Sequence, residues 1–190
     1  SLSTLSGLET LNVSYNSLTS VFPLGGCLSL KELNVSHNFI TSLNGIENMA
    51  QLTLLEAGNN ELKDASPIAN CTQLTQLNIS YNAITDITHL SVLTALKSFD
   101  FSHNKIAALP AFPRNCALVT LDGSYNSLTS VERLRGLENL NTVTVDYNKL
   151  KTVDPLADCP ILSRVDCFGN SIKNVSKLKD AYILVNYDPS

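Results

Sequence analysis

The hydrophobic positions of the chain recur with a strict period of 22 residues. An asparagine stands at one fixed position in each period, and apolar residues stand eight and five residues before it and two, five and eight residues after it. A fixed period of this length is typical of a solenoid, in which each repeat buries its apolar face only against its neighbours. The repeated asparagines are Asn16, Asn38, Asn60, Asn82, Asn104, Asn126, Asn148 and Asn170.

The pattern inside one repeat predicts its local structure. Alternating apolar residues before the asparagine, such as Leu77 and Ile79, predict a short strand, and successive strands should stack in parallel. The asparagine amide should satisfy backbone groups at the bend that follows the strand. Prolines such as Pro23 and Pro67 favour turns and short 3₁₀ segments on the other side.

The predicted fold class is therefore an α/β solenoid. We expect a curved, right-handed superhelix with a parallel, concave β-sheet and short 3₁₀ or irregular convex segments. Ala57 and Gly123 take an inward strand position that is larger in other repeats, and we expect the rings of Phe99 and Phe101 to fill the space beside Gly123.

The segment KELNVSHN, residues 31–38, fits the pattern L-x-x-L-x-L-x-x-N-x-L. It resembles the leucine-rich repeat. The 22-residue length and the segment NAITDI, residues 82–87, resemble two members of that class most: the repeat-built regulator of protein phosphatase 1 and the bacterial internalins. This resemblance implies a binding function, but the repeat framework identifies no partner, since one fold hosts many functions.

Residues 1–190 are expected to form a single leucine-rich repeat domain with eight ladder-asparagine repeats, which continues beyond both ends. Leu2 and Leu5 occupy the positions of an earlier repeat, and Leu184 and Tyr187 occupy those of a later one. Neither end resembles the polar cap that a solenoid requires. The domain is expected to be a monomer or part of a larger chain.

Composition narrows the classes of partner. The net charge is −4 and 44% of the residues are hydrophobic, which favours a packed domain and argues against a nucleic-acid binder, because such proteins present a basic face. No apolar run is long enough to cross a bilayer, so no membrane insertion is expected.

The cysteines bear on the compartment. Each of the five is read as a small core hydrophobe, because repeat spacing separates their positions too far for disulfides and no Cys/His spacing fits a metal site. Reduced thiols favour an intracellular, cytoplasmic setting, with the cell surface as the alternative. Glycosylation sequons at Asn12, Asn34 and Asn78 would obstruct the concave face, which also argues against a secreted eukaryotic receptor. The cysteines are Cys27, Cys71, Cys116, Cys159 and Cys167.

Outward strand residues predict an uneven concave face. Tyrosine and histidine concentrate in the column directly before the asparagines, and carboxylates gather toward the C-terminal end. We expect this acidic, aromatic patch to bind a partner protein with a basic, Lys- or Arg-containing surface. The alternatives are that the rings cover the lip of the core and that the carboxylates form a solvated face. The candidate residues are Tyr81, Asp100, His103, Asp122, Tyr125, Asp146, Tyr147, Arg164, Asp166 and Phe168.

No catalytic constellation, cofactor or metal site is predicted. His37 and His103 recur as a surface column, and no orienting group or oxyanion site accompanies the nearby Ser124. The pair Asp100 and Asp122 offers fewer oxygens than the six to eight that Ca²⁺ takes.

The predicted function is therefore that of a protein–protein interaction scaffold or regulatory subunit, not an enzyme. The alternative is an exported adhesion or surface-recognition module of internalin type. A structural spacer inside a larger protein is a third interpretation.

Overall fold

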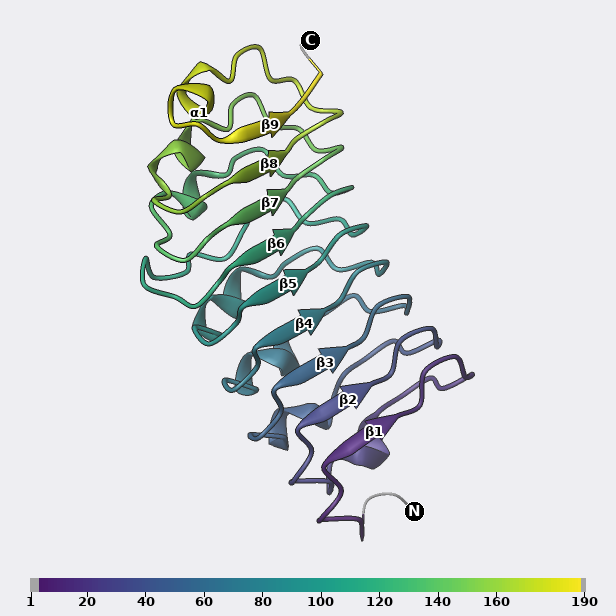
Figure 1. The fold of residues 1–190 in the computed structure, drawn as a ribbon. Helices are drawn as coiled ribbons and strands as arrows, with labels where there is room; N and C mark the ends of the chain where they lie inside the picture. Colours follow the sequence, from purple (N-terminus) through teal and green to yellow (C-terminus); the bar gives the residue numbers. More distant parts are fainter. Residues whose placement is uncertain (1–3, 189–190) are drawn as a thin grey trace.

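The computed structural model describes residues 4–188. Three-residue strands form one parallel sheet in chain order, and short helices occupy the opposite side of the solenoid (Figure 1). The strands are β1 Thr10–Asn12, β2 Glu32–Asn34, β3 Leu54–Glu56, β4 Gln76–Asn78, β5 Ser98–Asp100, β6 Thr120–Asp122, β7 Thr142–Thr144, β8 Arg164–Asp166 and β9 Leu184–Asn186. The 3₁₀ helices are η2 Phe22–Leu24, η3 Ile46–Asn48, η4 Ser66–Asn70, η5 Thr88–Val92, η6 Glu132–Leu134 and η7 Asp154–Asp158, and α1 is Ser176–Asp180.

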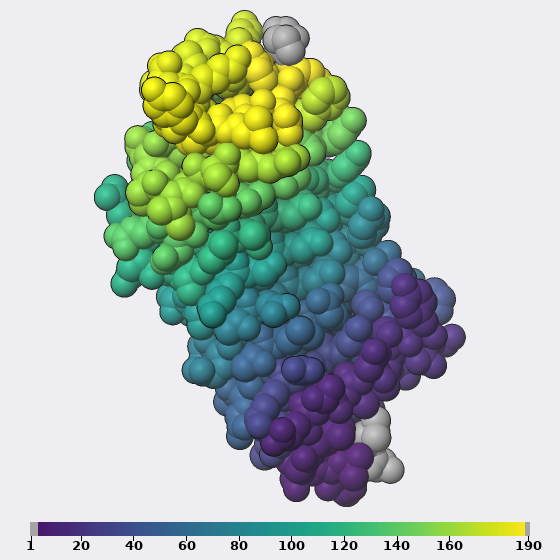
Figure 2. All heavy atoms as spheres, in the orientation of Figure 1, coloured from purple at the N-terminus to yellow at the C-terminus, as the bar shows by residue number. Residues whose placement is uncertain are grey.

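This arrangement confirms the predicted solenoid. The central residue of each strand lies beside its counterpart one period away, as Leu33 does with Leu55 and Leu55 with Leu77. These side chains are buried against the apolar residues that follow each asparagine, such as Ile40 and Leu62. The successive colour bands in Figure 2 follow the chain, as expected when each turn packs on the turns beside it.

The repeated asparagines hold neighbouring turns together, as the sequence predicts. Nδ2 of Asn104 donates to the carbonyl oxygens of Ile79 and Phe101, both at 3.0 Å. It also lies 3.2 Å from the carbonyl of Ser102, and Oδ1 accepts from the backbone N–H of Ile84 at 2.9 Å. Ile79 and Ile84 belong to the preceding turn, so one amide satisfies backbone groups of two turns that no regular ladder reaches.

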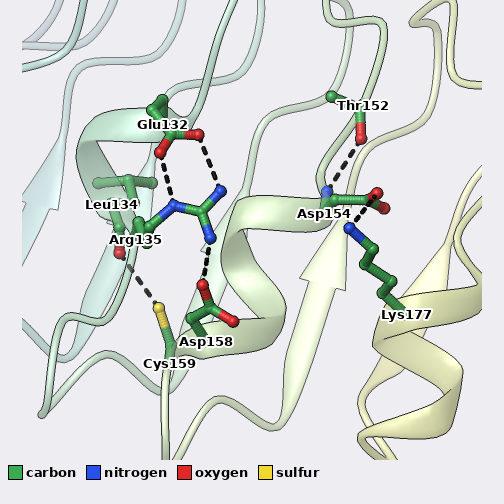
Figure 3. Close-up of polar contacts among 8 residues, drawn as sticks. All are labelled: Glu132, Leu134, Arg135, Thr152, Asp154, Asp158, Cys159 and Lys177. Atoms are coloured by element: carbon green, nitrogen blue, oxygen red, sulfur yellow. Dashed lines mark hydrogen bonds and ion pairs between the residues drawn. The ribbon is translucent and has the colours of Figure 1, made fainter.

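Ion pairs on the side away from the sheet connect the C-terminal turns (Figure 3). Arg135, next to η6, bonds to Glu132 of the same turn and to Asp158 of η7. Lys177 of α1 lies 3.1 Å from Asp154 of η7. All five side chains are partly exposed, so each pair contributes at most about 1 kcal/mol.

The last turn departs from the predicted phase. Val185, not Tyr187, lies beside Val165, so the sequence-based placement of Leu184 and Tyr187 is wrong by two residues. The reason is the end of α1, where Tyr182 takes a left-handed conformation with φ of 59°. The N–H groups of Tyr182 and Ile183 donate to the carbonyls of Lys179 and Leu178, at 3.0 and 2.9 Å. This Schellman motif ends the helix and returns the chain to the sheet early. At the other end, Leu2 lies outside the described residues.

The space beside Gly123 is filled by an aromatic ring, as predicted. A Cβ atom on Gly123 would lie 2.5 Å from the ring of Phe101. Phe99 and Phe101 are tilted by 53°, with centroids 4.9 Å apart, rather than stacked in parallel. Both rings are buried, so the small residue in one turn compensates for the large one in the turn before it.

Replacing an internal ladder asparagine should destabilise the whole solenoid. Asn104→Ala leaves the N–H of Ile84 without its partner and removes one of the two amide hydrogen bonds to each of the carbonyls of Ile79 and Phe101. We expect a loss of about 3 kcal/mol in the free energy of unfolding, measured with urea. Asn16→Ala is the matched control, because Asn16 is exposed and bonds only to carbonyls of its own turn. If Asn104→Ala and Asn16→Ala lowered the free energy of unfolding equally, the ladder amide would not act by joining two turns.

A methyl group at position 123 should collide with the neighbouring ring. We expect Gly123→Ala to lower the free energy of unfolding by about 1–3 kcal/mol, because Phe101 is enclosed and has no space to move into. Phe101→Leu removes the colliding ring atoms, so the double variant should lose less than the sum of the single variants. Additive losses in the urea-unfolding cycle would show that the two residues do not share this space.

Candidate functional site

A row of stacked rings runs along the carboxyl ends of the strands. Tyr81, His103, Tyr125 and Tyr147 occupy the same position in four consecutive turns, and we name them the aromatic ladder. The centroids of Tyr81 and His103 are 3.9 Å apart, those of His103 and Tyr125 4.1 Å, and those of Tyr125 and Tyr147 4.5 Å. Interplanar angles of 12–18° make these parallel stacks. Four of the ten candidate residues therefore form one continuous structure.

The backbone at each ladder position is left-handed. Residues other than glycine adopt this backbone conformation at a cost of about 1–2 kcal/mol, so it is unusual that residues with bulky rings adopt it in turn after turn. The turn that precedes it is stabilised by side chains. In one turn Oδ1 of Asn78 accepts from both the N–H and the hydroxyl of Ser80, at 2.9 and 2.7 Å. The residues before the ladder asparagines that take this conformation are Tyr15, His37, Asn59, Tyr81, His103, Tyr125, Tyr147 and Gly169.

Stacking determines which atoms of the rings a partner can reach. The faces of His103 and Tyr125 are covered on both sides by neighbouring rings, so their edges and polar tips face the solvent. Gly169 covers Tyr147, because a Cβ atom at Gly169 would lie 2.5 Å from that ring. Reduced hydration and a hydrogen bond to Tyr147 raise the pKa of the Tyr125 phenol. A guanidinium group of a partner therefore has no free ring face to stack on in the interior of the aromatic ladder.

Carboxylates lie on the sheet beside the aromatic ladder. Asp100 and Asp122 are direct neighbours on β5 and β6. Burial raises the pKa of Asp100, and the nearby charge of Asp122 adds to that effect, although hydrogen bonds from Ser102 oppose it. Burial also raises the pKa of Asp146, with further contributions from Asp166 and Asp122. Folding therefore holds like charges together at this face at a cost in stability.

The remaining candidates lie at the C-terminal end of the same face. Arg164 and Asp166 form an ion pair within β8, with Nε and Oδ2 2.8 Å apart. Phe168 is exposed, tilts against Tyr147 at a centroid distance of 6.3 Å, and donates its N–H to Asp146 at 2.6 Å. Arg164 therefore neutralises Asp166. Within residues 4–188, no basic side chain forms an ion pair with the other three carboxylates of the patch, Asp100, Asp122 and Asp146.

One column has a structural role that the sequence reasoning missed. Ser80, Ser102 and Ser124 occupy a column that the alternation along each strand would place outward, but all three are buried. Oδ1 of Asp122 accepts from the N–H of Ser124 at 2.9 Å, as Asn78 does from Ser80, so these residues close the turn after the strand. The recurring Asn/Asp-x-Ser triplet was the available signal, but its asparagine-containing copies were considered only as glycosylation sequons.

A family model for leucine-rich repeats, described as two copies of the repeat, matches residues 6–48 and 50–92. Together with the strict ladder of asparagines and the single parallel sheet, this match decides the class. The chain is a leucine-rich repeat protein. Such repeats are typically non-enzymatic modules for protein–protein interaction.

Solved structures agree with this class. Internalin C2 of Listeria monocytogenes is 28% identical, with a TM-score of 0.90 over 97% of this chain and 82% of that one. Another internalin of that organism, InlF, is 23% identical, with a TM-score of 0.90 over 98% of this chain and 55% of that one. The ectodomain of the Arabidopsis thaliana receptor kinase GASSHO1/SCHENGEN3 is 20% identical, with a TM-score of 0.86 over 100% of this chain and 25% of that one. No curated protein matches the chain.

The cysteines of this leucine-rich repeat protein are all buried, as predicted. Burial raises the pKa of the Cys71 and Cys167 thiols to about 12, so their reactive thiolate forms are scarce at neutral pH. Sγ of Cys159 donates to the carbonyl of Leu134 at 3.1 Å, which ties one turn to the next (Figure 3). These thiols act as packing residues.

Metal-binding clusters and membrane-spanning helices are both absent from the described part of the chain. Within residues 4–188, no three His, Cys, Asp or Glu side chains are grouped in a way that could hold a metal ion. None of the helices in that range has the length and apolar character needed to cross a membrane.

The raised pKa of Asp100 predicts a pH-dependent gain from its amide. Folding disfavours the ionised form, so Asp100→Asn should be more stable than the wild type at pH 7, where asparagine can still accept from Ser102 as Asn78 does from Ser80. The difference should shrink as the pH falls through the raised pKa and disappear below the ordinary value of 3.8, where the wild-type carboxyl is protonated in both states. Urea unfolding at pH 7 and pH 3 measures it.

Asp166→Asn provides the control, because Asp166 is neutralised by Arg164. This variant should gain no stability at pH 7. A gain equal to that of Asp100→Asn would mean that general net charge, rather than the local environment of Asp100, governs the effect.

Proposed function

We propose that this leucine-rich repeat protein is a scaffold or regulatory subunit that binds a basic partner protein on the face of its sheet, over β4 to β8. The observation that carries the proposal is a set of uncompensated carboxylates beside a row of exposed ring edges. Asp100, Asp122 and Asp146 stand on adjacent turns, next to Tyr125 and Tyr147.

Electrostatics supports a basic partner. The raised pKa values of Asp100 and Asp146 mean that folding these carboxylates into place costs stability. Lysine or arginine side chains of a partner would relieve that cost, and the exposed phenol groups would supply further hydrogen-bond partners. The ladder tyrosines add contact area with few rotatable bonds, which limits the entropy lost on binding.

The related structures support protein recognition in general. The ectodomain of the plant receptor kinase GASSHO1/SCHENGEN3 was solved in complex with Casparian strip integrity factor 2. The internalin resemblance favours a second candidate, an exported surface-recognition module. The two candidates differ in compartment, and we retain the intracellular setting as the first. A signal peptide and a cell-wall anchor in the full-length gene would favour the second. Neither candidate includes a catalytic step.

The proposal predicts which kind of peptide the domain selects from a random library. A random peptide library displayed against the domain should yield peptides rich in arginine and lysine, because the face carries unpaired carboxylates. The triple variant Asp122→Asn, Tyr125→Ala and Tyr147→Ala should lower their affinity at least tenfold while the domain remains folded by circular dichroism.

The matched control changes exposed residues away from the sheet face. Phe22→Ala with Glu138→Gln removes one charge, as the triple variant does, and one exposed ring, and it should leave peptide affinity unchanged. Selected peptides that bind the triple variant as tightly as the wild type, or a selection without basic enrichment, would contradict the proposed surface.

A further inference from the structure

The column of rings has one missing rung. Tyr15 stacks on His37 with centroids 4.1 Å apart, and Tyr81 begins the aromatic ladder, but the turn between them carries Asn59. Asn59 has the same left-handed backbone as its neighbours, with φ of 55°. The interruption therefore comes from the side chain alone and not from a change in the course of the backbone.

The missing rung leaves a slot between two rings. Adjacent turns of a sheet are about 4.8 Å apart, so rings two turns apart stand roughly 8–10 Å apart. One planar group needs about 3.5–4.0 Å on each side, which matches this spacing. Tyr15 covers one face of His37 and His103 covers one face of Tyr81, and among the described residues no ring contacts the other face of either.

The side chain at the base of the slot is short and polar. A carboxamide ends well before the outer edge of a tyrosine ring, so Asn59 fills only the inner part of the gap. Within the described residues, the Asn59 amide makes no hydrogen bond, although its backbone N–H donates to Ser80 at 2.9 Å. Its oxygen is available to accept from a group that enters between the rings.

The turn that contains Asn59 also departs from the repeat pattern at two other positions, Glu56 and Gly58. Glu56 stands where the two turns on each side of it carry asparagine, at Asn34 and Asn78. Burial raises the pKa of Glu56, although a hydrogen bond from Asn78 opposes this effect. Gly58 replaces the usual serine and brings Oδ1 of Asn78 within 3.0 Å of the point where a Cβ would lie. A carboxylate, an unpaired amide and a gap between rings thus coincide in one turn.

We propose that the slot between His37 and Tyr81 holds an arginine side chain of the partner protein. This inference rests on the proposed function and names a specific anchor for it. A guanidinium group is planar, stacks on aromatic faces and presents several donors. Asn59 accepts one of these donors, and Glu56 supplies negative charge from the same turn. The exposed ring faces at this slot thus provide the stacking that the interior of the aromatic ladder excludes.

The charge and shape of the slot select arginine over the other candidates. The ammonium group of lysine is compact and strongly hydrated, and it does not fill a flat gap between two rings. An uncharged aromatic side chain would fill the gap, but it would supply no positive charge to Glu56 and no donor to the Asn59 amide oxygen.

The test uses arginine and lysine as capped amides. Titration of the protein with N-acetyl-arginine amide at pH 8 should give saturable NMR shifts of the His37 and Tyr81 ring signals. N-acetyl-lysine amide should bind at least fivefold more weakly. Equal affinity for both probes, or shifts of the same size at Tyr125 and Tyr147, would overturn the proposal.

Two substitutions of one residue provide the control. Asn59→Tyr completes the column of rings, on a backbone that tyrosine already adopts at Tyr15 and Tyr81, and it should abolish arginine binding. Asn59→Ala keeps the gap and removes the amide, so it should weaken binding no more than about tenfold. Arginine binding that survives Asn59→Tyr in the folded protein would overturn the proposal.

The basic peptides selected against the domain separate the two proposals. Peptides that lose affinity in the triple variant and keep it in Asn59→Tyr would reject the slot and retain the proposed surface. Peptides that lose affinity in Asn59→Tyr and keep it in the triple variant would retain the slot and reject the surface over β4 to β8. Affinity that survives both changes would reject both proposals.

Discussion

The fold depends on one repeated interaction, the bonding of a partly buried asparagine amide to backbone groups of two successive turns. A turn of this solenoid bends after only three strand residues, which leaves carbonyl and N–H groups inside the bend without ladder partners. Asn104 shows how a single side chain satisfies them on both sides. Because each ladder amide from Asn38 onward reaches into the turn before it, these turns are not satisfied independently of one another.

The sequence predicted this framework because the physical demand is the same in every turn. Equivalent positions such as Leu33 and Leu55 lie beside one another in successive turns and have the same surroundings. The repeated pattern therefore predicts the fold class, the strand positions and the role of Asn104. The last turn differs because the left-handed residue Tyr182 ends a helix, and side-chain periodicity does not report backbone caps. The packing of Phe101 against Gly123 was predictable because the two changes in volume compensate.

The candidate surface was only partly predictable from the sequence. The position of each residue within the 22-residue repeat revealed the column of tyrosines and histidines and the row of carboxylates. It did not reveal the contacts that these side chains make. Stacking between His103 and Tyr125 covers ring faces that a partner would otherwise reach, and the pair of Arg164 and Asp166 neutralises part of the acidic row. The turn that Asp122 forms with Ser124 depends on a local hydrogen bond, and the 22-residue pattern of outward positions does not predict that bond.

The left-handed residue before each ladder asparagine has a consequence for how such a protein can be altered. Tyrosine, histidine, asparagine and glycine all occupy this position with φ between 51° and 64°, as Tyr81, His37, Asn59 and Gly169 show. The backbone of the turn is held by its neighbours, so the residue there can be exchanged without resetting the frame. The rim therefore combines a constant backbone with side chains that contact their neighbours, and recognition can be changed at one turn without moving the backbone of the others.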